Sequence, residues 1–200
     1  MPLMFGKYRG TVTNNVDPMA MARIQVMVPA VAASEQWWAM PCCPFAGPDI
    51  GLCLIPPVGA NVWVEFEGGD IAFPIWSGCF WGAGEYPAEA QVQQPEMVQV
   101  LKGYGFKLVA NSVGPTGLTI EVSPPMVGRT LRIVLNESGI LVSNEDEMTL
   151  KLTESAIEIE VQHKCKISMS SSTLDLSNAG ASVKISPVTV NVNNGALEVT

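Results

Sequence analysis

Residues 157–169 read IEIEVQHKCKISM, and this stretch decides the class of the fold. Apolar side chains, joined by His163 and Cys165, occupy every second position from Ile157 to Met169, and polar or charged side chains fill the positions between them. Successive side chains of a β-strand point to opposite faces, so this alternation predicts a strand with one apolar and one polar face. The alternation also runs for longer than a usual strand.

Shorter alternating runs surround this stretch, and the parity of their apolar positions changes from one run to the next. Every change falls at a polar, Gly- or Pro-containing join, such as residues 136–139, 153–156 and 177–181. Because a slip of one residue turns the apolar side chains to the opposite face, we expect these joins to be turns or bends that restore the buried face. The apolar positions of the shorter runs are Leu131-Ile133-Leu135, Met148-Leu150-Leu152, Leu174-Leu176, Val183-Ile185, Val188-Val190-Val192 and Leu197-Val199.

Strands of this kind need a partner surface, because they are narrow and lack the large residues that fill a sandwich. Lone β-ribbons are marginal in water, and their open edges invite pairing with other chains. Three copies that turn their apolar faces to a common axis would bury those faces and close the edges. We therefore expect an intertwined three-chain β-helical needle, a β-prism. The residues expected at the trimer axis are Ile157, Ile159, Val161, Ile167, Met169, Val188, Val190 and Val192.

The N-terminal part of the chain has a different composition, with all five Trp and 11 of the 15 Pro at or before position 95. Five short strands in under 90 residues fit a small barrel of the OB type. The fold class is thus all-β, with an OB-fold barrel over residues 1–86, a polar linker over 87–103 and a trimeric β-helix spike over 104–200. The five strands are predicted over residues 8–14, 22–28, 35–40, 60–67 and 74–81, with turns at 15–18 and 68–70.

The charge of the chain argues against a nucleic-acid partner. Its net charge is −8 with 11 basic residues, whereas binding to phosphates rests largely on a positive field. Two alternatives stay open. A β-helical carbohydrate-binding or adhesion protein would share the repetitive strands, although it does not explain the barrel motifs. An OB-fold nucleic-acid-binding protein would stack bases on Trp37, Trp38, Trp63 and Trp76.

Several stretches resemble the central spike of contractile injection systems. The family includes phage baseplate assembly protein V, the VgrG-like type VI secretion spike and the spikes of extracellular injection particles. Ala22 stands where the family often has Gly, and no lysozyme domain is inserted after the barrel. The stretches that carry the resemblance are YRGTV at 8–12, DP at 17–18, ARIQV at 22–26, PPVGANVWVEFEGGD at 56–70, FPIWSG at 73–78 and VNVNNGALEV at 190–199.

This resemblance implies a structural role. The barrels would form a trimeric collar on the baseplate hub protein, and sheath contraction would drive the needle through the target membrane. A small PAAR-type tip protein would sit on the end of the needle, in contact with Leu197 and Val199. With no signal peptide visible, we expect synthesis in the cytoplasm and assembly into the baseplate of a phage-like particle, either a virion or an extracellular injection particle.

The sequence gives little support to catalysis, so no catalytic residue is predicted and the protein is expected not to be an enzyme. His163 is the single histidine, and its parity places it on the inward face of the needle. Five cysteines without a Cys-x-x-Cys pair favour small buried residues over a zinc site or disulfides. No cofactor is expected, and packed, neutral side chains are the favoured reading of His163 and Cys165. The other reading is an axial metal ion held by rings of these two residues, as in some spikes of the resembling family.

Overall fold

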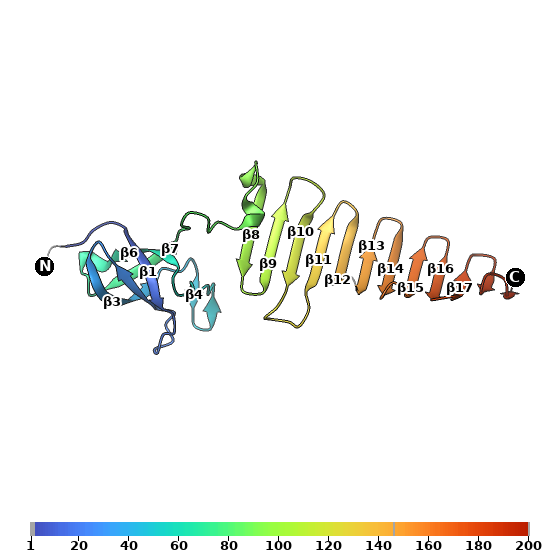
Figure 1. The fold of residues 1–200 in the computed structure, drawn as a ribbon, viewed down its shortest axis with the longest axis horizontal. Coiled ribbons are helices and arrows are strands. Elements are labelled where there is room, and N and C mark those ends of the chain that lie inside the picture. Colours follow the sequence, from blue (N-terminus) through green and yellow to red (C-terminus); the bar gives the residue numbers. More distant parts are fainter. Residues whose placement is uncertain (1–2, 146, 200) are drawn as a thin grey trace. The chain divides into compact units, whose positions relative to one another are not determined.

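The computed structural model describes residues 3–145 and 147–199, so positions 1, 2, 146 and 200 of the expected domains lie outside the described residues. The chain divides into two compact units, Met1–Tyr86 and Pro87–Thr200 (Figure 1). Both are built from β-strands, which confirms the all-β prediction. The helical segments of the described chain are turns of three residues, and none of its helices has the length and apolar character needed to cross a membrane.

Five strands of the first unit close into a barrel in the order β1-β2-β3-β7-β6. The pairing of β3 with β7 is parallel, and every other pairing in the barrel is antiparallel. A closed five-stranded barrel of this kind is the OB-type architecture predicted from the sequence. The strands are β1 (Tyr8–Asn14), β2 (Ile24–Val28), β3 (Ala32–Pro41), β6 (Asn61–Phe66) and β7 (Pro74–Cys79).

Alternation within the barrel strands builds the core. On β6 the side chains of Val62, Val64 and Phe66 are buried, whereas those between them are only partly covered. The turn after β6 is a 3₁₀ turn, η1 (Glu67–Gly69), where Gly68 and Gly69 adopt positive φ angles. These φ values suit glycine, which explains the glycine pair at this turn. The buried core consists of Val12, Ile24, Val26, Val28, Ala39, Val62, Val64, Phe66 and Trp76.

The β1–β2 loop is fixed by one carboxylate. Asp17 accepts hydrogen bonds from the backbone N–H groups of Met19, Met21 and Arg23 and from two nitrogens of the Arg23 guanidinium, the shortest at 2.7 Å. The Arg23 contact, followed by the backbone donors, holds the pKa of Asp17 well below its usual range. Arg23 also lies over the ring of Trp38. The loop is therefore tied to the barrel wall.

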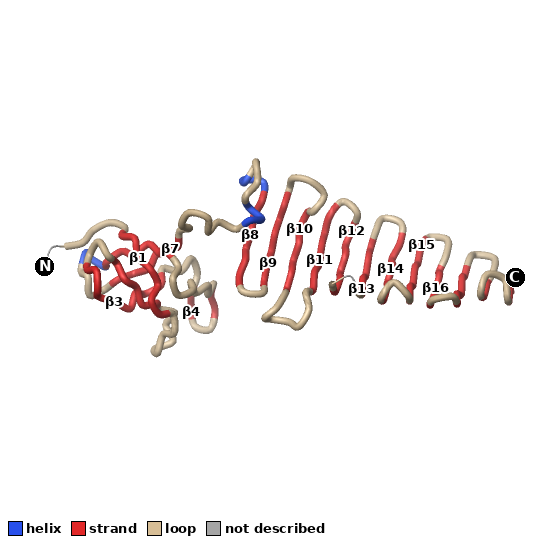
Figure 2. Tube along the Cα trace, viewed as in Figure 1, coloured by secondary structure: helices blue, strands red, loops and turns tan. Residues whose placement is uncertain are grey.

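The second unit is one antiparallel sheet in which each strand pairs with the next along the chain, from β8 to β19 (Figures 1 and 2). The strands shorten from six residues in β8–β12 to three in β18 and β19, so the sheet narrows toward the C-terminus. Their bounds are β8 (Val98–Gly103), β9 (Phe106–Asn111), β10 (Gly117–Val122), β11 (Leu131–Asn136), β12 (Gly139–Asn144), β13 (Met148–Leu152), β14 (Ala156–Val161), β15 (Cys165–Ser170), β16 (Leu174–Asn178), β17 (Ala181–Ile185), β18 (Val190–Val192) and β19 (Leu197–Val199).

The expected linker over 87–103 is too long. Its last six residues form β8, which pairs with β9, and the preceding residues form the turns η2 (Ala88–Ala90) and η3 (Pro95–Met97). Val98 and Ala90 are buried although the surrounding sequence is polar. An ion pair of 2.9 Å between Lys102 of β8 and Glu89 of η2 also joins this segment to the sheet.

Two expected axial positions lie on hairpin turns instead. Residues 157–169 form two strands, and the turn 162–164 that joins them carries His163. Val188 lies in the turn between β17 and β18, which the Ser186–Thr189 hydrogen bonds close, and it is exposed. The prediction for His163 failed for a reason of spacing. A tight reversal that brings Val161 opposite Cys165 keeps the even spacing of the apolar positions, so alternation alone cannot reveal it.

We predict that Asp17→Asn lowers the thermal midpoint of the barrel by several degrees, because the amide loses the charge that Arg23 and the backbone donors share. Tryptophan fluorescence reports the barrel selectively, since all five tryptophans lie in residues 1–86. Glu35→Gln, on exposed β3 surface, is the control and should leave the midpoint unchanged. Equal midpoints for Asp17→Asn and the control would contradict this role of Asp17.

We predict that replacing Gln162-His163 with Asn-Gly stabilises the sheet. Both residues have positive φ angles, 51° and 52°, which Asn and Gly adopt at lower cost. The expected gain in the free energy of unfolding is about 1 kcal/mol per chain, measured by circular dichroism in guanidinium. The same Asn-Gly pair at Ser171-Ser172, where no positive φ is required, should give no gain. A gain at both turns would argue against backbone strain as the cause.

Candidate functional surface

One face of the β8–β19 sheet is largely apolar, and on β8 it carries Leu101 together with Gln99 and Gly103. The strand registers align its side chains in three rows that run from strand to strand, and we call this surface the apolar face. Asn144 and Asn178 are polar interruptions in one flanking row. The central row consists of Leu101, Leu108, Ile120, Ile133, Val142, Leu150, Ile159, Ile167, Leu176, Val183, Val192 and Leu197.

The apolar face is the more exposed side of the sheet in the single chain. On β14 Ile157 and Ile159 are exposed, with fractions of 39% and 40%, whereas Glu158 and Glu160 beside them are only partly exposed. Covering the remaining surface of one such isoleucine is worth on the order of 1 kcal/mol. Exposed apolar side chains on most of the twelve strands indicate a surface that another chain covers.

The opposite face carries pairs of unlike charges between neighbouring strands. Lys107 and Arg132 flank Glu121 at 2.9 and 2.8 Å, and Lys166 contacts Glu158 at 2.7 Å. The Lys107 hydrogen bond, followed by that of Arg132, lowers the pKa of Glu121, and the Lys166 hydrogen bond lowers the pKa of Glu158. Cross-strand pairs of this kind suit a solvated surface, where each pair contributes modestly to the stability of the folded sheet.

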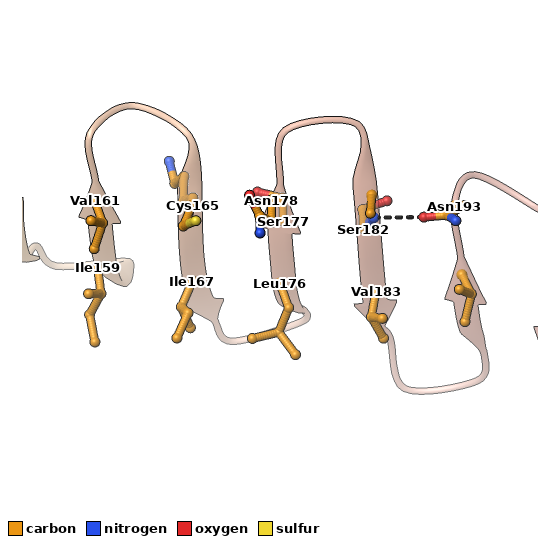
Figure 3. A pocket seen from close by; sticks show the side chains of 13 residues that line it. Ile159, Val161, Cys165, Ile167, Leu176, Ser177, Asn178, Ser182, Val183 and Asn193 are labelled. Carbon is orange, nitrogen blue, oxygen red and sulfur yellow. Dashed lines mark hydrogen bonds between the residues drawn. The ribbon is translucent and has the colours of Figure 1, made fainter.

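Near the C-terminal end the apolar face forms a shallow concavity of about 410 Å³ (Figure 3). Ile159, Ile167 and Leu176 follow one another on successive strands at one level, with Val161, Cys165 and Asn178 in the row beside them. A hydrogen bond of 2.9 Å from the Ser182 N–H to Asn193 Oδ1 closes its far side. Its lining is largely aliphatic, which suits packing against another apolar surface.

Most of the residues expected at the trimer axis lie on this face, namely Ile157, Ile159, Val161, Ile167, Met169, Val190 and Val192, and Val188 does not. Leu197 and Val199, expected to contact a tip protein, lie on the same face in the last strand. Sequence reasoning missed the start of the face on β8–β10. The alternation of Leu118, Ile120 and Val122 was the signal that could have found β10.

The structure separates the two residues that were considered as candidate axial metal ligands. Cys165 lies on the apolar face, whereas His163 is exposed on the turn before it and pairs with Glu160 at 2.6 Å. The inward orientation predicted for His163 is therefore wrong. Within residues 3–145 and 147–199, no three His, Cys, Asp or Glu side chains of the chain are grouped as metal ligands.

The four tryptophans considered for base stacking already have partners in the barrel. Trp76 belongs to the buried core, and Trp37 packs against Phe66. Trp38 lies under Arg23. The remaining one, Trp63, contacts Phe80 and the guanidinium of Arg9.

We predict that Glu121→Gln reduces stability at neutral pH and not at acid pH. The pKa of Glu121 is lower in the folded protein, so its contribution is present above its ordinary pKa and is lost as the pH falls through the folded value. At pH 7 we expect a loss of about 0.5 kcal/mol in the free energy of unfolding, since the Arg132 side of the pair is open to solvent. The difference should shrink as the pH falls below the ordinary pKa of a glutamate, whereas exposed Glu137→Gln should show no difference at neutral or acid pH.

Comparison with known families accounts for both units. Residues 8–81 match the family described as the type VI secretion system/phage-baseplate injector OB domain, which spans all five strands of the barrel. Residues 145–198 match the phage baseplate V C-terminal trimerisation domain, which spans β13–β18 and most of β19. No curated protein matches the chain.

The two matches together cover more than half of the 200 residues. The first match accounts for the closed barrel, and the second is consistent with an apolar face that the single chain leaves uncovered. The families are structural baseplate families rather than enzyme families, and the match to a trimerisation domain supports a homotrimer of this chain. The chain therefore belongs to the phage baseplate V family of trimeric spike proteins, which are associated with the baseplates of phages and type VI secretion systems.

Proposed function

We propose that three copies of the chain form the central spike of a contractile injection machine. The barrels attach the spike to the baseplate hub protein, and the β8–β19 sheets form the needle. Contraction of a sheath drives this needle through the membrane of a target cell. The work of the protein is mechanical, and no side chain is assigned a catalytic role.

The observation that carries this proposal is the exposure pattern of the sheet. Isoleucines more exposed than their neighbouring glutamates give three copies a reason to associate, since only association removes the apolar face from water. The charged face stays in solvent on the outside of the needle. Unfolding then requires both loss of the sheet hydrogen bonds and exposure of the axis, which favours slow dissociation under load.

The narrow end of the sheet suits a tip protein. β19 is the last strand of the sheet and has β18 as its neighbour, so its other edge presents backbone groups and the side chains of Leu197 and Val199. Open edges of this kind invite pairing or capping. We assign this end to a small conical partner of the PAAR type, which would also protect the edge from aggregation.

We predict that Leu176→Asp abolishes the trimer, whereas Ser177→Asp leaves it intact. The two residues are neighbours on β16, with Leu176 on the apolar face and Ser177 on the opposite face beside Lys166. Three carboxylates inside the needle would have to be desolvated, and those outside would not. Native mass spectrometry should give a monomer for the first variant and a trimer for the second. Trimers from both variants, or a monomeric wild-type protein, would refute the proposed needle.

The same pair of variants tests the injection role. Particles assembled with Ser177→Asp should contract and release a dye from target cells, as wild-type particles do. Particles with Leu176→Asp should lack a central spike in electron micrographs and release no dye, even where the sheath contracts. Normal dye release by particles that lack the spike would refute a role in puncturing the envelope.

A further inference from the structure

Residues 42–58, which we call the apolar arm, connect β3 to β6 and form a surface that the spike function described above does not use. Their sequence is CCPFAGPDIGLCLIPPV, with Asp49 as the only charged residue. The arm folds into a small hairpin of two two-residue strands, β4 (Ala46–Gly47) and β5 (Ile50–Gly51).

The arm is anchored at both ends and projects between them. The Cys42 N–H donates to the Trp76 carbonyl at 3.0 Å, and Asn15 Nδ2 donates to the Pro56 carbonyl at 3.1 Å. One further backbone bond, from Leu52 to Phe45, supports the hairpin at 3.0 Å. The arm is thus a defined element of the barrel unit.

Its apolar side chains are uncovered in the single chain. All twelve residues from Pro44 to Ile55 are exposed, and the largest ones expose between 37% and 61% of their surface. A two-stranded ribbon without a covered apolar side is marginal in water, and a continuous apolar patch marks an interaction site. The large side chains of this surface are Phe45, Ile50, Leu52, Leu54 and Ile55.

We propose that the apolar arm of each barrel packs against the barrel of a neighbouring copy within the trimer. Residues 145–198 match a trimerisation domain, and the barrel unit ends at Tyr86, with residues 87–97 before β8. Eleven residues span at most about 40 Å, so trimerisation holds the three barrels close together. The effective concentration of one barrel near another is then in the millimolar range. This inference rests on the trimer of the proposed function.

A second copy fits the arm better than the hub protein does. A surface reserved for the hub would stay exposed on every free spike until the baseplate assembles, with a continuing risk of aggregation. A neighbouring barrel covers the arm as soon as the trimer forms. In a three-fold ring each copy gives one surface and receives a different one, so three such contacts close the ring.

The receiving surface that we assign is the β1–β2 loop of the neighbouring copy. Val16, Met19 and Met21 are exposed on this loop, which the five hydrogen bonds to Asp17 hold in place. The bond from Asn15 to Pro56 places the loop and the arm at the same end of the barrel, where both can face a common axis. Methionines adapt to irregular apolar partners.

The test replaces Phe45 with the photo-crosslinking residue p-benzoylphenylalanine in the full-length trimer, at nanomolar concentration and without hub protein. Ultraviolet irradiation should give covalent dimers and trimers on a denaturing gel, at several times the yield found with the same residue at exposed Glu35. Mass spectrometry should place the attachments in residues 15–22 of the second chain. Dilution should not change the yield, because the contact lies within one trimer.

Other outcomes overturn the inference in separate ways. Attachment within the same chain would mean that the arm is covered by its own protomer. No attachment in the absence of hub protein would mean that the hub protein is the partner of the arm. Attachment to another part of the neighbouring barrel would overturn the assignment of the β1–β2 loop. Native mass spectrometry of the same sample separates these results from failure of the proposed function, since a trimer that gives no crosslink between chains refutes only the arm contact.

Discussion

The structure depends on one mismatch: the β8–β19 sheet satisfies its backbone hydrogen bonds within the chain but cannot cover its own apolar face. Each strand pairs with its sequence neighbours, so the ladder needs no second chain. Ile157 and Ile159 nevertheless remain more exposed than the glutamates beside them. Backbone pairing thus shapes the protomer, whereas the hydrophobic effect on one face drives association. The charged face opposite it limits that association to one side.

The two units cover their apolar side chains in different ways. The barrel closes on itself, and nine side chains from Val12 to Trp76 fill its interior without help from another chain. The sheet stays open and leaves its rows of Leu, Ile and Val to other copies. A chain with both units can therefore complete its barrel first and its needle only on assembly.

Sequence alone predicted the class of each unit because alternation and turn residues are local signals. The alternation in residues 157–161 put Ile157, Ile159 and Val161 on one side of a strand, and the structure has all three on the apolar face. His163 was misplaced, since a turn that preserves even spacing leaves no trace in the alternation. Strand β8 was missed because residues 87–99 are largely polar and its own sequence, VQVLKG, does not alternate strictly. Local alternation does not show where a hairpin of this kind reverses or which residues from different segments pack into a small core.

Apolar contact alone fixes the position of neighbouring chains poorly, because it has no preferred direction. A needle held only by rows of Leu, Ile and Val would resist separation but tolerate sliding of one sheet against another. The proposed contact between the apolar arm and the neighbouring barrel would add a constraint away from the axis. That constraint would act through a short connection of 87–97, so small shifts between sheets would strain it. A spike built in this way would transmit force through the sheets and keep its copies aligned through the barrels.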